Sequence, residues 1–178
     1  LQAQWHQTNG PEGGAVYSMA ASGSTVFVAV QMGGVYRSTD YGQTWLSDNY
    51  GLIDTVSYLP PFVIPNVNAF TSYGDSIFAG TQGGGIFLST DKGQNWSPIN
   101  EGLTDPYIQA LAIHNHQIFA GTREKGVFIS KDNGLSWTSS SNGLTNGWVS
   151  ALAVQGNNIF AGTWSWAYGG MFLSTDEG

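Results

Sequence analysis

The stretch Ser89-Thr90-Asp91-Lys92-Gly93-Gln94-Asn95-Trp96 recurs along the chain as Ser, Asp, Gly and Trp at fixed spacing. It returns at residues 38–45 and 130–137, and its first five positions return at residues 174–178. Each copy lies inside a longer repeat, because the run IFAGT at 77–81 has counterparts at 118–122 and 159–163. A diverged counterpart, VFVAV, lies at 26–30. Self-similarity of this kind predicts a repeat architecture.

The repeats have the length and internal pattern of β-propeller blades. Steps of 51, 41 and 41 residues separate the apolar residues that open them, Val16, Val67, Ile108 and Val149. Each repeat contains four short runs rich in β-branched and aromatic residues, with turn residues between them. A period of about 40–50 residues with four such runs is typical of a propeller blade. We therefore predict an all-β fold, a β-propeller with four blade equivalents of four antiparallel strands each.

The pattern S-x-D-x-G-x-x-W resembles the Asp-box, or BNR, repeat of β-propellers, as found in sialidases, xyloglucanases, sortilin-type receptors and photosystem assembly factors. The resemblance implies that the box lies at the blade periphery, far from any ligand site. Physically, the Asp can accept bonds from nearby backbone N–H groups, the Gly supplies backbone freedom and the Trp packs between sheets. We predict this structural role for Ser38, Asp40, Gly42, Trp45, Ser89, Asp91, Gly93, Trp96, Ser130, Asp132, Gly134, Trp137, Ser174, Asp176 and Gly178.

The predicted organisation is one propeller or propeller segment over residues 1–178. Trp5 and the residues after it look like the outer strand that begins at Trp137. Because an unpaired sheet edge seeks a partner, this segment is predicted to complete the last blade, in the same chain or in a neighbouring one. The ranges are 1–9 for the closing strand, 10–50 for blade 1, 51–100 for blade 2, 101–142 for blade 3 and 143–178 for blade 4, which lacks an outer strand of its own. A longer propeller, two chains joined in a larger ring, and a closed four-blade ring all stay open.

Composition restricts the partners. The formal net charge is −7 with only five Lys and Arg, so no basic surface is expected for nucleic acid or an anionic membrane. No apolar run approaches the roughly 20 residues that span a bilayer. Ala3 lies in a plausible signal-cleavage sequence, and low Lys with abundant Asn, Ser and Thr is typical of exported proteins. We therefore predict a bacterial protein that is secreted or located at the cell surface.

Departures from the repeat concentrate where the second and third strands of a blade connect and where one blade leads into the next. In a propeller these connections share the face opposite the Asp-box turns. Exposed aromatic residues gathered on a rigid scaffold would suit a glycan or a protein ligand. Packing of the aromatics onto the ring is the alternative. The predicted ligand-binding residues are Trp164, Trp166, Tyr168, Trp148, Tyr107, Tyr58 and Arg123.

Enzymatic readings are less favoured. Sialidases with Asp-boxes hold the substrate carboxylate with three arginines, whereas this chain has only Arg37 and Arg123. A glycoside hydrolase of the xyloglucanase type needs two carboxylates, which Asp54, Glu101, Asp105 and Glu124 could supply, although solvated loop charge explains them better. His114 and His116 lack a third ligand at metal-binding spacing.

No catalytic residue, cofactor or metal is predicted. The expected function is a non-catalytic module that binds carbohydrate or protein. The alternatives are an assembly subunit joined through open blade edges, as a homo-oligomer or a larger assembly, and a fragment of a glycoside hydrolase.

Overall fold

The computed structural model describes residues 4–53, 64–166, 169–176 and 178. Within these residues no helix has the length and apolarity to cross a membrane. The strands are β1 (Val16–Ser22), β2 (Thr25–Val30), β3 (Gly34–Ser38), β4 (Leu46–Ser47), β5 (Val67–Tyr73), β6 (Ser76–Thr81), β7 (Ile86–Ser89), β8 (Ser97–Pro98), β9 (Ile108–His114), β10 (Gln117–Thr122), β11 (Val127–Ser130), β12 (Thr138–Ser139), β13 (Val149–Gln155), β14 (Asn158–Thr163) and β15 (Met171–Ser174).

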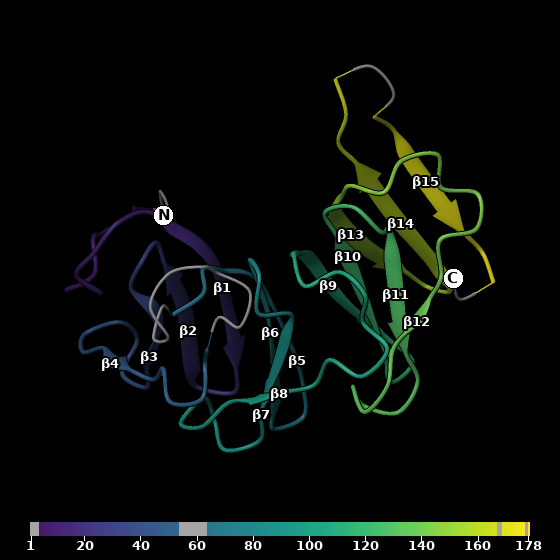
Figure 1. Ribbon diagram of the computed structural model, residues 1–178. Coiled ribbons are helices and arrows are strands. Elements are labelled where there is room, and N and C mark those ends of the chain that lie inside the picture. Colours follow the sequence, from purple (N-terminus) through teal and green to yellow (C-terminus); the bar gives the residue numbers. More distant parts are fainter. Residues whose placement is uncertain (1–3, 54–63, 167–168, 177) are drawn as a thin grey trace.

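The strands form four antiparallel sheets, each made of consecutive strands (Figure 1). Blade 1 is β1–β4, blade 2 is β5–β8, blade 3 is β9–β12 and blade 4 is β13–β15. The first strand of each blade packs against the first strand of the next, in the order β1, β5, β9, β13. This is the arrangement of successive propeller blades, so the predicted fold class is confirmed, with three strands rather than four in the described part of blade 4.

The hydrophobic core lies in the joints between blades. In the first joint, Phe27 and Val35 of blade 1 pack with Val67 and Ile77 of blade 2. Equivalent clusters fill the joints between blades 2 and 3 and between blades 3 and 4. Close approach depends on small residues, because a Cβ built on Gly80 would lie only 2.5 Å from Cγ2 of Ile108 in the next blade.

Each Asp-box is a turn closed by its own side chains. In blade 2, Ser89 Oγ donates to Asp91 Oδ1 at 2.8 Å and accepts the Gly93 N–H at 2.8 Å. Asp91 Oδ1 also accepts the Asn95 N–H at 2.9 Å. Gly93 has a φ of 85°, in the left-handed region that glycine tolerates best. The boxes of blades 1 and 3 repeat these bonds with Thr44 and Ser136 in the place of Asn95.

These bonds stabilise the charged form of the carboxylates. A hydrogen bond from the Thr44 side chain is the main cause that lowers the pKa of Asp40 to about 2. A hydrogen bond from the Ser136 side chain likewise lowers the pKa of Asp132 to about 2. The side chain of Asn95 lowers the pKa of Asp91. The three acids are thus engaged in turn structure at the blade periphery.

The Asp-box tryptophans join neighbouring blades. Trp96 lies among the residues of the first joint, and its Nε1 donates to the Asp48 carbonyl of blade 1 at 3.0 Å. Trp137 does the same in the second joint, where its Nε1 donates to the Ile99 carbonyl at 2.7 Å. Each indole therefore contacts both the blade that contains it in sequence and the preceding blade.

The prediction that residues 1–9 complete blade 4 is wrong for closure within one chain. The described part of this segment forms no strand, and the Trp5 side chain is 97% exposed. Figure 1 shows the first and last blades at opposite ends of the molecule, and β13 is not among the strands that pack on β1. The segment instead lies beside blade 1, where a Cβ built on Gly42 would lie 2.9 Å from Cγ2 of Thr8. Completion by a neighbouring chain stays a prediction.

Candidate functional site

A bulge near the start of each first strand positions one side of the site. In blade 2 the antiparallel register runs Val67 to Thr81 and then Ala69 to Gly80, so Asn68 is left over. The same shift leaves over Tyr17, Gln109 and Ser150 in the other blades. A bulge re-aims the side chain of its extra residue. Four equivalent side chains are thereby set apart from the strand pairing.

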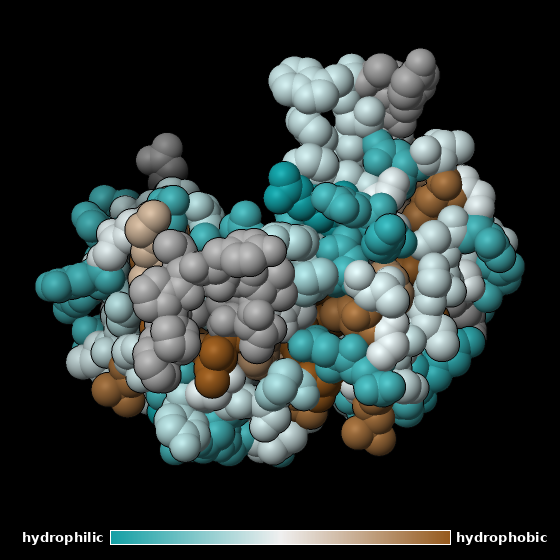
Figure 2. All heavy atoms as spheres, in the orientation of Figure 1, coloured by the Kyte–Doolittle hydropathy of each residue, from teal (hydrophilic) through white to brown (hydrophobic). Residues whose placement is uncertain are grey.

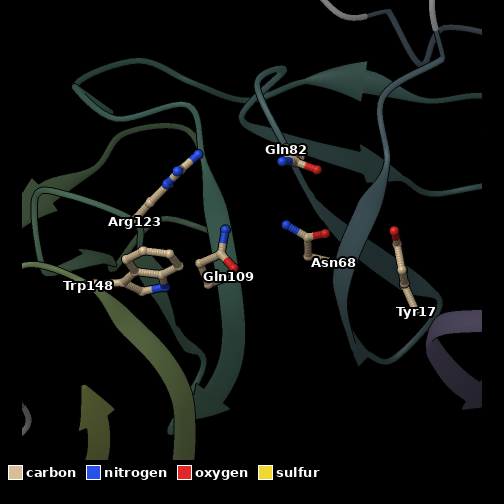
Figure 3. A pocket seen from close by; sticks show the side chains of 6 residues that line it. All are labelled: Tyr17, Asn68, Gln82, Gln109, Arg123 and Trp148. Atoms are coloured by element: carbon tan, nitrogen blue, oxygen red, sulfur yellow. The ribbon is translucent and has the colours of Figure 1, made fainter. Parts of the chain in front are cut away.

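Three of these residues line a depression with a volume of about 420 Å³, together with Gln82, Arg123 and Trp148. Figure 3 shows Arg123, Trp148 and Gln109 on one side, Asn68 and Gln82 facing them, and Tyr17 beyond. Asn68 also connects blades, since its Nδ2 donates to the Ile108 carbonyl at 2.9 Å. The wall thus combines amides, one guanidinium and aromatic rings.

A repeated backbone bond brings the predicted aromatic residues together. The N–H of Arg123, just after β10, donates to the Tyr107 carbonyl, just before β9, at 2.9 Å. In blade 4 the N–H of Trp164 donates to the Trp148 carbonyl at the same distance. In both blades, the residue that follows the second strand is therefore hydrogen-bonded to the residue that precedes the first strand.

The side chains then form a continuous row. The Arg123 guanidinium carbon lies 5.8 Å from the Tyr107 ring centre and 5.1 Å from that of Trp148. The centroids of Trp148 and Trp164 are 4.5 Å apart, and those of Trp164 and Trp166 are 5.4 Å apart. Among the described residues no carboxylate lies within ion-pair distance of the Arg123 guanidinium. The row therefore presents one cation against aromatic faces.

The end of the row formed by Trp164 and Trp166 is exposed, whereas Tyr107, Arg123 and Trp148 are half-buried. The described residues between β14 and β15, 164–166 and 169–170, project beyond their sheet, and the surface between them and the first blades is hollowed (Figures 1 and 2). Trp164 is 43% exposed and Trp166 is 93% exposed, so neither indole lies in the core of blade 4. A second depression of about 320 Å³ lies beside Trp148, Trp164 and Trp166.

Asp105 holds the loop that carries Arg123. Its buried carboxylate accepts the N–H groups of Glu124 at 2.7 Å, Lys125 at 3.2 Å and Tyr107 at 3.0 Å. In blade 4, Asn146 takes this position and accepts the Trp148 N–H at 2.9 Å. Asp105, considered above as a hydrolytic acid, is thus committed to backbone donors.

Five of the seven predicted site residues lie together in this row: Tyr107, Arg123, Trp148, Trp164 and Trp166. Tyr58 and Tyr168, like the candidate acid Asp54, lie outside the described residues. Arg37 is not part of this row. It lies in β3 of blade 1, where it forms an ion pair with Asp48.

Sequence reasoning missed Tyr17, Asn68, Gln82 and Gln109. The available signal was that the second position of each first strand is never aliphatic, although an apolar residue always precedes it.

Comparisons with known proteins identify only the fold. No protein-family model matches the chain, and no curated protein matches it in sequence. A computationally designed protein, Ika4, is similar in structure, with a TM-score of 0.69, 14% identity and 98% of each chain covered. YCF48 bound to D1 peptide has a TM-score of 0.64 and 17% identity, over 93% of this chain and 56% of YCF48. An ancestral GH74 enzyme has a TM-score of 0.69 and 22% identity, over 100% of this chain and 25% of the enzyme.

All of these identities are low, and the chain spans about half of YCF48 and a quarter of the GH74 enzyme. They show a β-propeller fold that this chain shares with a designed protein, with YCF48 and with a GH74 enzyme, and fold alone does not assign an activity. The chain is thus a β-propeller with four successive blades, with an aromatic row and a polar depression on one face.

Proposed function

We propose that this face binds an extended peptide segment of a protein partner, as a non-catalytic recognition module outside the cell. The observation that carries the proposal is the row formed by Tyr107, Arg123, Trp148, Trp164 and Trp166 beside the depression. Aromatic and arginine side chains are the commonest energetic anchors of protein interfaces. Backbone bonds fix the main chain at Tyr107, Arg123, Trp148 and Trp164, which lowers the cost of ordering these anchors on binding.

The depression supplies the polar half of the recognition. Side-chain amides carry both donors and acceptors, as peptide groups do, and they lie on both sides of the depression, with Gln109 facing Asn68 and Gln82. A peptide main chain laid in this depression could pair with the amides while its apolar side chains contact the indoles. The peptide-bound structure of YCF48, a similar propeller, supports a peptide ligand by analogy.

Ring geometry favours a protein over a carbohydrate, the other ligand class considered above. A glycan platform needs indole faces on which pyranose rings can lie flat. Here the planes of Trp148 and Trp164 are inclined by 52°, and those of Trp164 and Trp166 by 68°. Such inclined rings make pockets for irregular side chains rather than one flat surface.

The proposal can be tested by probing the chain with a random peptide display library and, in parallel, with a glycan array. We expect selected peptides to bind the unaltered chain and to lose about 1–3 kcal/mol of binding free energy for each anchor removed in Trp164→Ala and Trp166→Ala. Leu135→Ala is the matched control, since Leu135 is exposed on an Asp-box turn. Glycan binding without peptide binding would favour the carbohydrate alternative. Peptides that bind the double variant unchanged would contradict the proposal.

A further inference from the structure

The aromatic row carries hydrogen-bond donors that the protein itself leaves unused. The indole N–H groups of Trp96 and Trp137, in the Asp-boxes, donate to backbone carbonyls at 3.0 and 2.7 Å. By contrast, within the described residues the indoles of Trp148, Trp164 and Trp166 donate to no protein oxygen or nitrogen. Trp148 Nε1 is not buried away from solvent, and the other two side chains are exposed. All three N–H groups are therefore open to a ligand.

Arg123 extends this set of donors. Its guanidinium lies against the rings of Tyr107 and Trp148, and no carboxylate in the described part of the chain pairs with it. Guanidinium and indole groups donate hydrogen bonds and accept none. Apart from the Tyr107 hydroxyl, the side chains of the row thus offer donors without acceptors. A ligand that lies on the row has to supply the acceptors.

The rings of the row meet in two successive corners. The planes of Trp148 and Trp164 are inclined by 52° with their centroids 4.5 Å apart, and those of Trp164 and Trp166 by 68° with centroids 5.4 Å apart. A corner between inclined rings contacts a compact apolar group on two sides. Laid end to end, the two centroid steps are close in length to one turn of a polyproline II helix, about 9 Å for three residues.

A proline-rich segment meets both requirements. Proline has a carbonyl acceptor but no backbone N–H, so a run of prolines supplies acceptors without donors. Its pyrrolidine ring is the compact apolar group that a corner between two indoles contacts best. The polyproline II helix has no internal hydrogen bonds, so each of its carbonyls is free to accept. Such a segment is also stiff before it binds, which lowers the entropy cost of ordering it.

The placement of the donors favours this helix over a bound β-strand. Trp148 precedes β13, Arg123 follows β10, and the remaining two indoles follow β14. The donors thus come from three separate connections rather than from the main chain of one strand edge. Carbonyls of a helix with three residues per turn point in several directions around its axis, whereas those of a strand lie along its two edges.

The depression beside the row accommodates the flanking residues of the same segment. Figure 3 shows Gln109 facing Asn68 and Gln82 across it. Their amides both donate and accept, so residues that keep a backbone N–H can pair there. The donor-only row and the amide-lined depression therefore divide the ligand into a proline part and an ordinary part.

We propose that the peptide ligand of this face is a proline-rich segment in the polyproline II conformation. Its proline rings lie in the corners formed by Trp148, Trp164 and Trp166, and its carbonyls accept from the indoles and from Arg123. The inference rests on the proposed peptide-binding function and names the ligand class. Specificity follows, because a residue with an N–H in place of proline brings a donor toward donors and leaves both unpaired.

Nuclear magnetic resonance of the nitrogen-labelled chain tests the donor argument directly, since each indole N–H gives its own signal. An oligoproline peptide of about eight residues is the probe, and a peptide of the same length made of alanine and serine is the control. We expect oligoproline to shift the indole signals of Trp148, Trp164 and Trp166, which gain an acceptor. The signals of Trp96 and Trp137 should stay in place, because these groups already have one.

The variant Trp164→Phe separates the donor from the ring, because it keeps an aromatic face and removes the N–H. We expect it to bind oligoproline about three- to tenfold more weakly. Trp5→Phe makes the same change at an indole that is 97% exposed and lies outside the row, so it should leave the affinity unchanged. Undiminished affinity in Trp164→Phe would overturn the donor argument.

The display library distinguishes failure of this inference from failure of the proposed function. Peptides selected on the unaltered chain should be enriched in proline and displaced by oligoproline. Selected peptides that bind through the row without proline enrichment, and that oligoproline does not displace, would overturn the inference and leave the peptide-binding function intact. Absence of binding by both the library and oligoproline would instead remove the proposed function itself.

Discussion

The joints between blades make a sharp prediction about two glycines at equivalent positions, Gly121 in β10 and Gly162 in β14. A Cβ built on Gly121 would lie 2.7 Å from Val149 Cγ1 and 3.0 Å from the Val149 carbonyl oxygen. The nearest atom to a Cβ on Gly162 is the Ala151 Cβ at 3.5 Å, an ordinary contact. Neither glycine has a positive φ, so Ala is compatible with the backbone at both.

The magnitude follows from the contacts. Carbon atoms pack best at about 3.5–4.0 Å, so Gly121→Ala forces an overlap of nearly 1 Å with a stiff β-branched side chain and with backbone. Overpacking of this kind costs about 1–3 kcal/mol. Replacing Gly by Ala also restricts the unfolded chain, which stabilises the fold by about 0.4–1 kcal/mol at both positions. Gly121→Ala should therefore be destabilising, and Gly162→Ala neutral or slightly stabilising.

Urea unfolding followed by tryptophan fluorescence measures the difference. We expect the two variants to differ by about 1–3 kcal/mol in the free energy of unfolding, with the denaturant slope unchanged. A Gly121→Ala variant as stable as Gly162→Ala would refute the argument that the glycines are required by close packing of the following blade.

Further expectations concern pH, a buried acid and the indole donors. Because the pKa values of the Asp-box acids are lowered on folding, the stability they confer is complete above pH 4 and declines as pH falls toward 2. Thermal melting between pH 5 and 2 should show this decline in melting temperature. The variant Asp132→Asn should show a smaller decline over the same pH range. Asp105→Ala should cost about 1–3 kcal/mol in unfolding free energy because it leaves backbone donors unpaired, whereas Asp105→Asn should retain part of that stability. Trp137→Phe should cost about 0.5–1.5 kcal/mol more than Trp45→Phe in the monomer, since only Trp137 has an acceptor for its Nε1, and equal losses in urea unfolding would count against this.

The sheets were predictable because each blade repeats the same contacts. Ile86 and Val127 occupy the same column, and a residue that must fill the same joint in successive blades leaves a visible periodicity. The aromatic row was predictable for the opposite reason. Trp164 and Trp166 interrupt the repeat, and a departure from a packing-driven pattern indicates a residue free to serve another role.

The strand register at the bulges and the position of the N-terminal segment were harder to predict from the sequence. The bulge that sets Asn68 and Gln109 apart is a property of strand pairing, so neither sequence nor propensity marks it directly. The placement of Trp5 failed within one chain for a related reason. Sequence matching paired the segment with the edge of blade 4, but the order in which blades pack holds that edge at the far end of the molecule.

The tryptophans shared between blades have a consequence for fragments of the chain. Trp96 is buried by residues of blade 1 as well as blade 2, so a single blade expressed alone would contain no complete joint. A fragment of two blades, residues 10–100, would contain one, with the Trp96 indole bond to Asp48 intact. Cooperativity should then extend only between nearest neighbours, as in linear repeat proteins. Mechanical extension from the C-terminus should accordingly release the joints one at a time, in the reverse of their order along the chain.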